Sequence, residues 1–352
     1  MVMAPILELV DVHKVFGDFA ALERIHLEIH DGEFVTIVGP SGSGKTTLIR
    51  MLVGMDQPTS GNILMRGERI NEMHANQRPT CMVFQSLALF PHRSVGENIE
   101  FPLKIRAVPK ASRRARAMEL LKQLHLPESF YHKGIHQCSG GERQRVALAR
   151  ALAFDPEILF FDEPLSALDY RLRKTLEKEL KAIQRSTGKT FVYITHSIEE
   201  AMVMSDRIAI LRSGRIVQVG TPDEIYHRPR DAFVAQFMGE INRFPVRKAS
   251  DGTLTDTETG ERYVPPTRVA DPEGTVLMIR PEQIHLLPEG ERMDNELSGV
   301  LTQSYSLGSR NQYQVSVDGR TVLVELLGRA NAAVGDAVRV GWPADAAMLL
   351  KA

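Results

Sequence analysis

The first two thirds of the chain alternate short apolar runs with helical patterns. Residues 34–38, 158–161 and 191–195 are almost continuously apolar, which is typical of strands buried on both faces of a sheet. Residues 47–52 follow the first of these runs with the spacing of a helix. Because the alternation continues from residue 6 to about residue 239, we predict an α/β fold in which helices cover a sheet.

The last third has a different pattern, with short alternating segments and almost no helical periodicity. Residues 313–317 and 320–324 alternate on either side of Asp318-Gly319, which predicts a β-hairpin. Similar glycine-containing pairs break the rest into short strands. We therefore place a boundary near residue 240, with an α/β domain over residues 1–240 and an all-β domain over residues 241–352.

The overall composition excludes several classes of protein. The 352 residues carry a formal net charge of -1, so the chain has no global attraction to nucleic acid or to an anionic membrane. Its basic run, Arg113, Arg114 and Arg116, lies in a helical pattern over residues 111–126, which predicts a solvated helix face. Two cysteines are too few for a disulfide framework, and no apolar stretch is long enough to span a membrane. With no signal-peptide pattern at the start, we expect a cytosolic protein without a nucleic-acid partner.

The stretch after the first apolar run fits the phosphate-binding loop G-x-x-x-x-G-K-[ST]. Gly39, Gly44, Lys45 and Thr46 occupy its fixed positions, between a predicted strand and a predicted helix. Glycines let backbone N–H groups close around phosphates, the lysine offsets phosphate charge, and the threonine hydroxyl ligates Mg²⁺. The residues expected to hold the phosphates are Gly39, Pro40, Ser41, Gly42, Ser43, Gly44, Lys45, Thr46 and Thr47.

Two acids and a proline end the apolar run at residues 158–161. Asp162 and Glu163 would lie at the carboxyl edge of the sheet, where open α/β sheets bind their ligands, and Pro164 would end the strand. Asp162 can hold Mg²⁺ directly or through water, and Glu163 can orient and deprotonate an attacking water. The alternative reading, a solvated turn, has less weight beside a phosphate loop.

A second turn of small residues precedes a strong helix former over residues 143–152. Ser139, Gly140, Gly141 and Glu142 would place exposed N–H groups and the positive end of a helix dipole at a second phosphate contact. This segment resembles the signature motif, usually written LSGGQ, of the ATP-binding cassette (ABC) ATPases. The resemblance implies that the signature motif of one copy closes over the γ-phosphate of an ATP held in the phosphate loop of a second copy.

Other residues match the same family in order along the chain. The resemblance implies that Phe16 stacks on adenine, that Gln85 senses Mg²⁺, and that His196 contacts the γ-phosphate. Residues 166–169, which end in Asp169, match the loop that crosses the dimer interface. We therefore expect catalysis by Lys45, Gln85, Glu163 and His196, with Mg²⁺ held by Thr46, Gln85 and Asp162.

Two residues depart from the family pattern. Cys138 replaces the usual leucine and Glu142 replaces the usual glutamine of the signature motif. Backbone N–H groups and Ser139 carry the phosphate contact, so neither change should abolish it, although the charge of Glu142 can retune affinity. We interpret Cys138 as a small apolar residue rather than a redox sensor, because no resolving cysteine lies near it in the sequence.

The resemblance also indicates which kind of ABC ATPase this is. The cassette resemblance covers residues 6–239 and implies a helical subdomain, in which residues 87–99 resemble the importer segment that docks a permease. Residues 241–352 resemble the OB-like (TOBE-like) regulatory β-domain of importer ATPases. We therefore expect a peripheral ATPase at the cytoplasmic face of the inner membrane. Its expected partners are two permease subunits, a second copy of itself and, indirectly, a periplasmic or extracellular solute-binding protein.

Other classes fit less well. A soluble cassette ATPase of DNA repair or translation would need a coiled-coil insertion, a zinc hook or a second cassette, none of which is visible in the sequence. A small-molecule kinase would need an acceptor site in place of the signature helix, and an exporter subunit would lack the C-terminal β-domain. Among solutes, the resemblance favours the polyamines spermidine and putrescine, while ferric iron, sugar and sulfate stay open.

Overall fold

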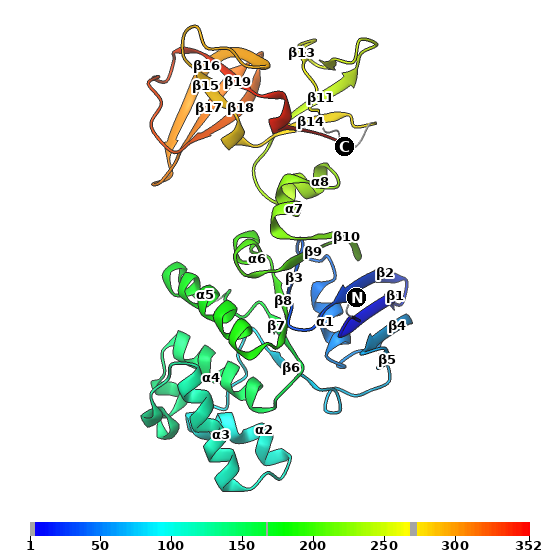
Figure 1. Ribbon diagram of the computed structural model, residues 1–352, viewed down its shortest axis with the longest axis vertical. Coiled ribbons are helices and arrows are strands. Elements are labelled where there is room, and N and C mark those ends of the chain that lie inside the picture. Colours follow the sequence, from blue (N-terminus) through cyan, green and yellow to red (C-terminus); the bar gives the residue numbers. More distant parts are fainter. Residues whose placement is uncertain (1–3, 167, 268–272) are drawn as a thin grey trace. The chain divides into compact units, whose positions relative to one another are not determined.

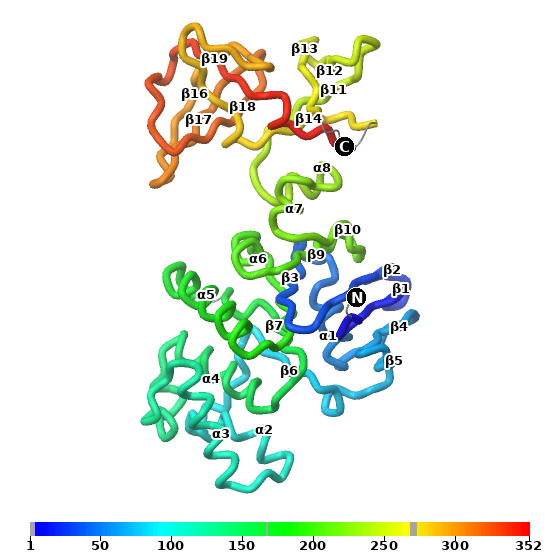
Figure 2. The backbone as a smooth tube through the Cα atoms, viewed as in Figure 1, coloured from blue at the N-terminus to red at the C-terminus, as the bar shows by residue number. Residues whose placement is uncertain are grey.

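The computed structural model describes residues 4–166, 168–267 and 273–352 of the chain. Contacts divide it into two compact units, Met1–Pro222 and Asp223–Ala352. This division falls before the boundary expected near residue 240, because Ala232 and Ala235 pack against Val276 and Met278 of the second unit. Figures 1 and 2 trace both units, and the two are described separately below.

The first unit contains an antiparallel sheet of order β2-β1-β4-β5. Its strands are β1 (Leu7–Phe16), β2 (Phe19–Ile29), β4 (Ser60–Met65) and β5 (Glu68–Arg69). Apolar residues alternate along β1, so that Leu7 and Leu9 are buried and Glu8 between them is more exposed. The sheet thereby buries one face and leaves the other in contact with solvent.

A second sheet of order β10-β9-β3-β8-β7-β6 forms the centre of the same unit. Its strands are β3 (Phe34–Val38), β6 (Thr80–Val83), β7 (Ile158–Asp162), β8 (Thr190–Thr195), β9 (Arg207–Arg212) and β10 (Arg215–Gly220). All neighbours pair in parallel except β10, which is antiparallel to β9. The predicted α/β fold with buried strands is confirmed, and parallel strands bring the ends of β3, β7 and β8 to one edge.

The central sheet is buried on both faces because its side chains alternate between two cores. Val35, Val192 and Phe160 pack with the antiparallel sheet and α1 (Lys45–Leu52). Phe34, Phe191 and Phe161 belong to a second core with the remaining helices of the unit. These helices are α2 (Val95–Ile105), α3 (Lys110–Gln123), α4 (Gly140–Ala153), α5 (Tyr170–Thr187) and α6 (Ile198–Met204).

Helices α2, α3 and α4 group together in Figure 1 as a helical subdomain. The short 3-10 turns Glu128–His132 and Ile135–Gln137 connect α3 to α4. The basic run on α3 contacts this subdomain, since Arg113 lies 3.3 Å from Glu100 and Arg114 stacks on Tyr131. The run is therefore only partly the solvated face that its pattern indicated.

The second unit is mainly β, as expected. From Asp223 it contains the rest of α7 (Pro222–His227) and α8 (Ala232–Phe237), which precede two five-stranded sheets of order β13-β12-β11-β14-β20 and β15-β19-β16-β17-β18. The first sheet contains β11 (Asn242–Lys248), β12 (Leu254–Asp256), β13 (Arg262–Tyr263), β14 (Val276–Ile279) and β20 (Ala347–Leu350). The second contains β15 (His285–Leu287), β16 (Asn295–Ser306), β17 (Asn311–Val317), β18 (Arg320–Leu326) and β19 (Ala337–Trp342).

The predicted hairpin of the second unit is confirmed as β17 and β18. Val317 pairs with Arg320, and both turn residues have positive φ, 47° at Asp318 and 79° at Gly319. Such a turn matches the twist of the strands it joins. Trp342 is fully buried in this unit and stacks on Phe244 at a ring distance of 5.5 Å, which anchors the core between the two sheets.

Candidate functional site

The phosphate loop lies between β3 and α1, at the carboxyl edge of the central sheet. A Cβ atom at Gly39 would lie 2.1 Å from the carbonyl oxygen of Leu211, so only glycine fits there. Gly44 has a φ of 105°, and a Cβ would lie 2.7 Å from the Leu22 side chain. The glycines at the two fixed positions of the loop motif are thus required by close packing and, at Gly44, by backbone conformation.

The loop concentrates polar groups that suit an anion. Among the described residues, no side chain caps the first turn of α1, so its first N–H groups remain available at the positive end of the helix dipole. The Lys45 ammonium donates to the carbonyls of Gly39 at 2.8 Å and Pro40 at 2.9 Å. Burial lowers the pKa of Lys45, an effect opposed by Glu163 and Asp162. The buried Ser43 hydroxyl lacks a hydrogen-bond partner among the described residues, which fits a phosphate oxygen.

Asp162 and Glu163 lie where β7 ends, beside β8 in the sheet. Asp162 pairs in register with Ile194, and the Glu163 N–H donates to the Ile194 carbonyl at 2.9 Å. Glu163 itself has a positive φ of 45°, which marks the sharp exit from the strand. Burial first, and then the charge of Glu163, raise the pKa of Asp162, while Lys45 opposes them. Lys45 and the two acids are therefore close enough for their charges to affect one another.

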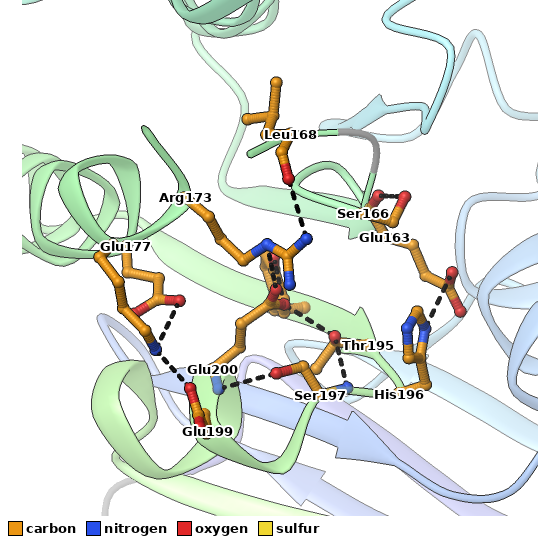
Figure 3. Close-up of polar contacts among 12 residues, drawn as sticks. Glu163, Ser166, Leu168, Arg173, Glu177, Thr195, His196, Ser197, Glu199 and Glu200 are labelled. Atoms are coloured by element: carbon orange, nitrogen blue, oxygen red, sulfur yellow. Dashed lines mark hydrogen bonds and ion pairs between the residues drawn. The ribbon is translucent and has the colours of Figure 1, made fainter. Parts of the chain in front are cut away.

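Figure 3 shows that His196 points toward Glu163. Its Nδ1 lies 3.2 Å from Glu163 Oε2, and its side chain is 63% exposed, against 25% for Glu163. The Ser166 hydroxyl donates to the Glu163 carbonyl at 2.9 Å and accepts from the Gln85 amide at 3.0 Å. The structure therefore brings together Gln85, Glu163 and His196, which lie far apart in the sequence.

The signature segment caps α4 in a reciprocal way. The Ser139 hydroxyl accepts from the Glu142 N–H at 3.3 Å, and the Glu142 carboxylate accepts from the Ser139 N–H at 2.9 Å. Lys133 also donates to this carboxylate at 2.9 Å. The Ser139 N–H and Lys133 hold the pKa of Glu142 below its ordinary value. The oxygen of Ser139 is thus occupied by the cap, while its O–H proton remains free to donate to an anion.

Cys138 packs in the core that α4 helps to form, and only 6% of its surface is exposed. Burial raises the pKa of its thiol. A buried thiol is a poor nucleophile, which agrees with the interpretation of Cys138 as a small apolar residue.

Three of the expected site residues lie apart from the acids. Phe16 ends β1 with half of its surface exposed, and the Lys14 ammonium lies 4.8 Å from the centre of its ring. Asp169 caps α5, since its carboxylate accepts from the Leu172 N–H at 3.0 Å. Within the described part of the chain, neither these two nor Ser139 hydrogen-bonds to Lys45 or Glu163. Residue 167 of the expected interface loop lies outside the described residues.

Sequence reasoning did not identify Lys133, Arg173 or Glu200, which contact site segments. The Ser139-to-Glu142 spacing is a capping-box pattern and could have shown that Glu142 faces backwards onto Ser139. Lys133 and Arg173 carry no comparable local signal, because their partners are set by packing.

Comparisons with known proteins identify the family of the chain. The sequence profile of the family described as "ABC transporter" matches residues 22–166, and that of the family described as "TOBE domain" matches residues 277–350. The chain is 42% identical to the "Spermidine/putrescine import ATP-binding protein PotA" of Pasteurella multocida (strain Pm70), covering 91% of this chain and 88% of that one. It is also 42% identical to the protein of the same name from Pseudomonas aeruginosa (strain UCBPP-PA14), covering 99% of both.

Solved structures support the fold of the first unit. The structure titled "Dimeric Structure of MJ0796, a Bacterial ABC Transporter Cassette" matches with a TM-score of 0.54 and 36% identity, over 61% of this chain and 98% of that one. Among the described residues, no helix is both long and apolar enough to cross a membrane. The chain therefore belongs to the ABC transporter family, as a nucleotide-binding ATPase with a C-terminal TOBE domain.

Proposed function

We propose that this chain is the ATP-hydrolysing subunit of an ABC import complex, and that the complex imports the polyamines spermidine and putrescine. The observation that carries the ATPase assignment is the approach of Glu163 to His196 at 3.2 Å, at the same sheet edge as Lys45 and Asp162. The printed names of relatives that match most of this chain support import and the polyamine solute. Ferric iron, sulfate and sugars are the competing solutes.

In this proposal different residues of one copy of the chain have separate roles in ATP hydrolysis. The phosphate-loop N–H groups and Lys45 hold the β- and γ-phosphates and offset their charge. Glu163 accepts a proton from the attacking water, and His196 contacts the γ-phosphate from the neighbouring strand. Gln85 senses Mg²⁺ and is connected to Glu163 by the hydroxyl of Ser166. The exposed Phe16 ring provides a stacking surface for adenine.

The donor groups fit Mg²⁺. One carboxylate, Asp162, and one hydroxyl, Thr46, come from this chain together with the amide of Gln85, and the phosphates supply further oxygens. Such a mixed oxygen shell is what Mg²⁺ prefers, and it requires no dedicated cluster of acids. When bound at these residues, Mg²⁺ would supply positive charge that offsets the negative charge developing during phosphoryl transfer.

Ser139, Gly140 and Gly141 act on the nucleotide of a second copy in this proposal. Ser139 keeps a free O–H proton, and the N-terminus of α4 carries a positive dipole end toward an anion. The matching solved cassette is dimeric by its title, which supports a dimer here. Asp169 belongs to the loop that would cross the dimer interface, although its carboxylate also caps α5.

The same proposal places the subunit at the cytoplasmic face of the inner membrane. Two permease subunits would dock on residues 87–99, and a periplasmic or extracellular solute-binding protein would act indirectly through them. The second unit, with its TOBE domain, would regulate the complex or support the dimer.

The test combines hydrolysis with transport. Cells lacking their own polyamine import ATPase would be given either the wild-type chain or Glu163→Gln, each with its permease and binding protein. We expect labelled spermidine and putrescine to enter only with the wild-type chain, and purified wild-type protein to hydrolyse ATP with Mg²⁺. If sulfate, ferric iron or maltose entered instead, the ATPase assignment would stand and the polyamine assignment would be overturned. A purified chain without Mg²⁺-dependent hydrolysis would overturn both.

A further inference from the structure

Glu200 is a buried carboxylate outside the set of residues assigned to the site. It lies in the first turn of α6, with 3% of its surface exposed. Its Oε2 accepts hydrogen bonds from Tyr193 at 2.9 Å and Thr195 at 2.7 Å, both on β8. Burial, and then Glu200 itself, raise the pKa of Tyr193 well above its ordinary value, so the phenol keeps its proton and donates. A buried acid satisfied in this way is held in one position.

The bonds of Glu200 hold the residues on both sides of His196. Thr195 donates to Glu200 and its hydroxyl oxygen also accepts from the Ser197 N–H at 2.9 Å. Ser197 in turn caps α6 by accepting from the Glu200 N–H at 3.3 Å. Figure 3 shows these contacts among Glu200, Thr195 and Ser197 beside His196. Because the ring is 63% exposed, its own packing restrains it little, and its direction depends on the backbone that Glu200 fixes.

The same carboxylate also faces the loop that follows Glu163. Arg173 of α5 lies between them: its Nε is 3.9 Å from Glu200 Oε1, and its Nη2 donates to the Leu168 carbonyl at 2.9 Å. Leu168 belongs to the segment between Glu163 and Asp169. The buried Glu200 carboxylate thus contacts Thr195, next to His196, directly. Through Arg173 it is also connected to Leu168, next to Asp169.

We propose that Glu200 is a positioning residue for ATP hydrolysis, which holds His196 in place against Glu163. This inference rests on the proposed roles of Glu163 and His196. Glu200 does not touch the phosphates in this proposal, so its loss should slow turnover without weakening nucleotide binding. A small displacement of His196 would be enough to slow turnover, since misplacement of a catalytic group by about 1 Å can lower the rate on the order of 10²-fold.

The main experiment compares Glu200→Gln with Glu199→Gln in the full chain. Glu199 is the adjacent acid, is exposed and pairs with Lys174 of α5 at 2.8 Å, so it controls for a general loss of contact between α5 and α6. We expect Glu200→Gln to lower kcat roughly 10- to 100-fold with unchanged Kd for ATP, and Glu199→Gln to leave both unchanged. Wild-type kcat in Glu200→Gln, or an equal loss in both variants, would overturn the proposal.

Single-turnover rates in a His196→Ala background separate positioning from a general structural role. If Glu200 acts through His196, Glu200→Gln should slow this background much less than it slows the wild-type chain. A full additional loss would show that Glu200 acts elsewhere and would overturn the proposal. If wild-type protein does not hydrolyse ATP at all, the proposed function and this inference fall together, whereas an active wild type with an unaffected Glu200→Gln variant overturns this inference alone.

A second pair of variants covers the case in which Glu200→Gln does not fold. Thr195→Val removes the hydroxyl that joins Glu200 to the Ser197 N–H while keeping the shape of the side chain, and Thr195→Ser keeps the hydroxyl. We expect Thr195→Val to reproduce the loss in kcat and Thr195→Ser to restore it. Equal rates for the two variants would overturn the proposal.

Discussion

Lys133 donates a hydrogen bond to Glu142 at 2.9 Å, and this contact offsets the charge that distinguishes the present signature motif. The carboxylate also accepts from the Ser139 N–H, so it is turned back onto its own helix cap. The unusual Glu142 therefore does not present an unpaired negative charge where the γ-phosphate of a second copy is proposed to bind. We therefore expect Lys133, nine positions earlier in the chain, to reduce the effect that the charge of Glu142 has on the affinity for ATP.

The first prediction tests this compensation. Lys133→Met should raise the KM for ATP about two- to fivefold, because both side chains are partly exposed and such pairs contribute about 1 kcal/mol or less. Glu142→Gln in the same chain should restore the wild-type KM, since it removes the charge that Lys133 offsets. Steady-state ATPase assays at low salt measure both. A double variant that is as impaired as Lys133→Met would contradict the explanation.

The second prediction concerns the proposed general base. Glu163→Gln should keep its affinity for ATP and lose roughly 10²- to 10⁴-fold in turnover, because the amide can orient water but cannot take its proton. The variant should accumulate as an ATP-bound dimer on gel filtration. Hydrolysis at near wild-type rate would show that another group is the base.

The third prediction separates nucleotide binding from general charge effects on α1. Lys45→Ala should weaken ATP binding roughly 10- to 100-fold, the usual value for a hydrogen bond to a charged group. Arg50→Ala removes an exposed cation from the other end of the same helix and should leave binding unchanged. Nucleotide titration followed by fluorescence or calorimetry provides the measurement. Tight binding by Lys45→Ala would count against the phosphate-loop assignment.

The fourth prediction uses the raised pKa of Asp162, which is caused by burial and by Glu163. As pH falls, the folded chain binds this proton before the unfolded chain does, so this group makes the free energy of unfolding rise with decreasing pH. The ionised carboxylate therefore lowers stability at neutral pH. Asp162→Asn should raise the Tm of the nucleotide-free protein at pH 7, by an amount that shrinks at acidic pH, while abolishing Mg²⁺-dependent turnover.

Asp56 provides the matched control for that experiment. Burial would raise its pKa, but the hydrogen bonds from Lys14 at 2.5 Å and from the Gln57 N–H, together with the charges of Lys14 and Arg50, lower it. Its charged form therefore stabilises the fold above the unfolded pKa, and this stability is lost as pH falls through the folded pKa. Asp56→Asn should lower the Tm at pH 7. The same sign of change in both variants would contradict the electrostatic explanation.

The fifth prediction distinguishes the two positions of the domain boundary. A fragment that ends at Glu240 keeps α8 but removes Val276, Met278 and Leu350, against which its alanines pack. We expect this fragment to bind ATP but to aggregate more than a fragment that ends at Pro222, as measured by light scattering. Equal solubility of the two fragments would favour the boundary near residue 240.

Much of the site follows from local sequence. The phosphate loop is recognisable from the fixed local spacing of Gly39, Gly44, Lys45 and Thr46, and at Gly44 the positive φ of 105° is a backbone conformation that glycine adopts readily. Asp162 and Glu163 are recognisable because a short, fully apolar run favours a buried strand, and the residues at its carboxyl end then lie at the edge of the sheet. The hairpin of β17 and β18 is equally local, since Asp318-Gly319 has the backbone conformation that joins two strands directly.

Contacts between distant segments required the tertiary structure. The place of α8 in the second unit, the pairing of Lys133 with Glu142, and the approach of Arg173 to both Leu168 and Glu200 depend on which helices pack together. The sequence pattern does not predict which residue a lysine or arginine side chain will contact, because its long stem can reach several neighbours. The sequence by itself determined the chemistry at each strand end, where local backbone geometry and residue type suffice. Only the tertiary structure decided which charges meet there, because packing of distant elements sets their separation.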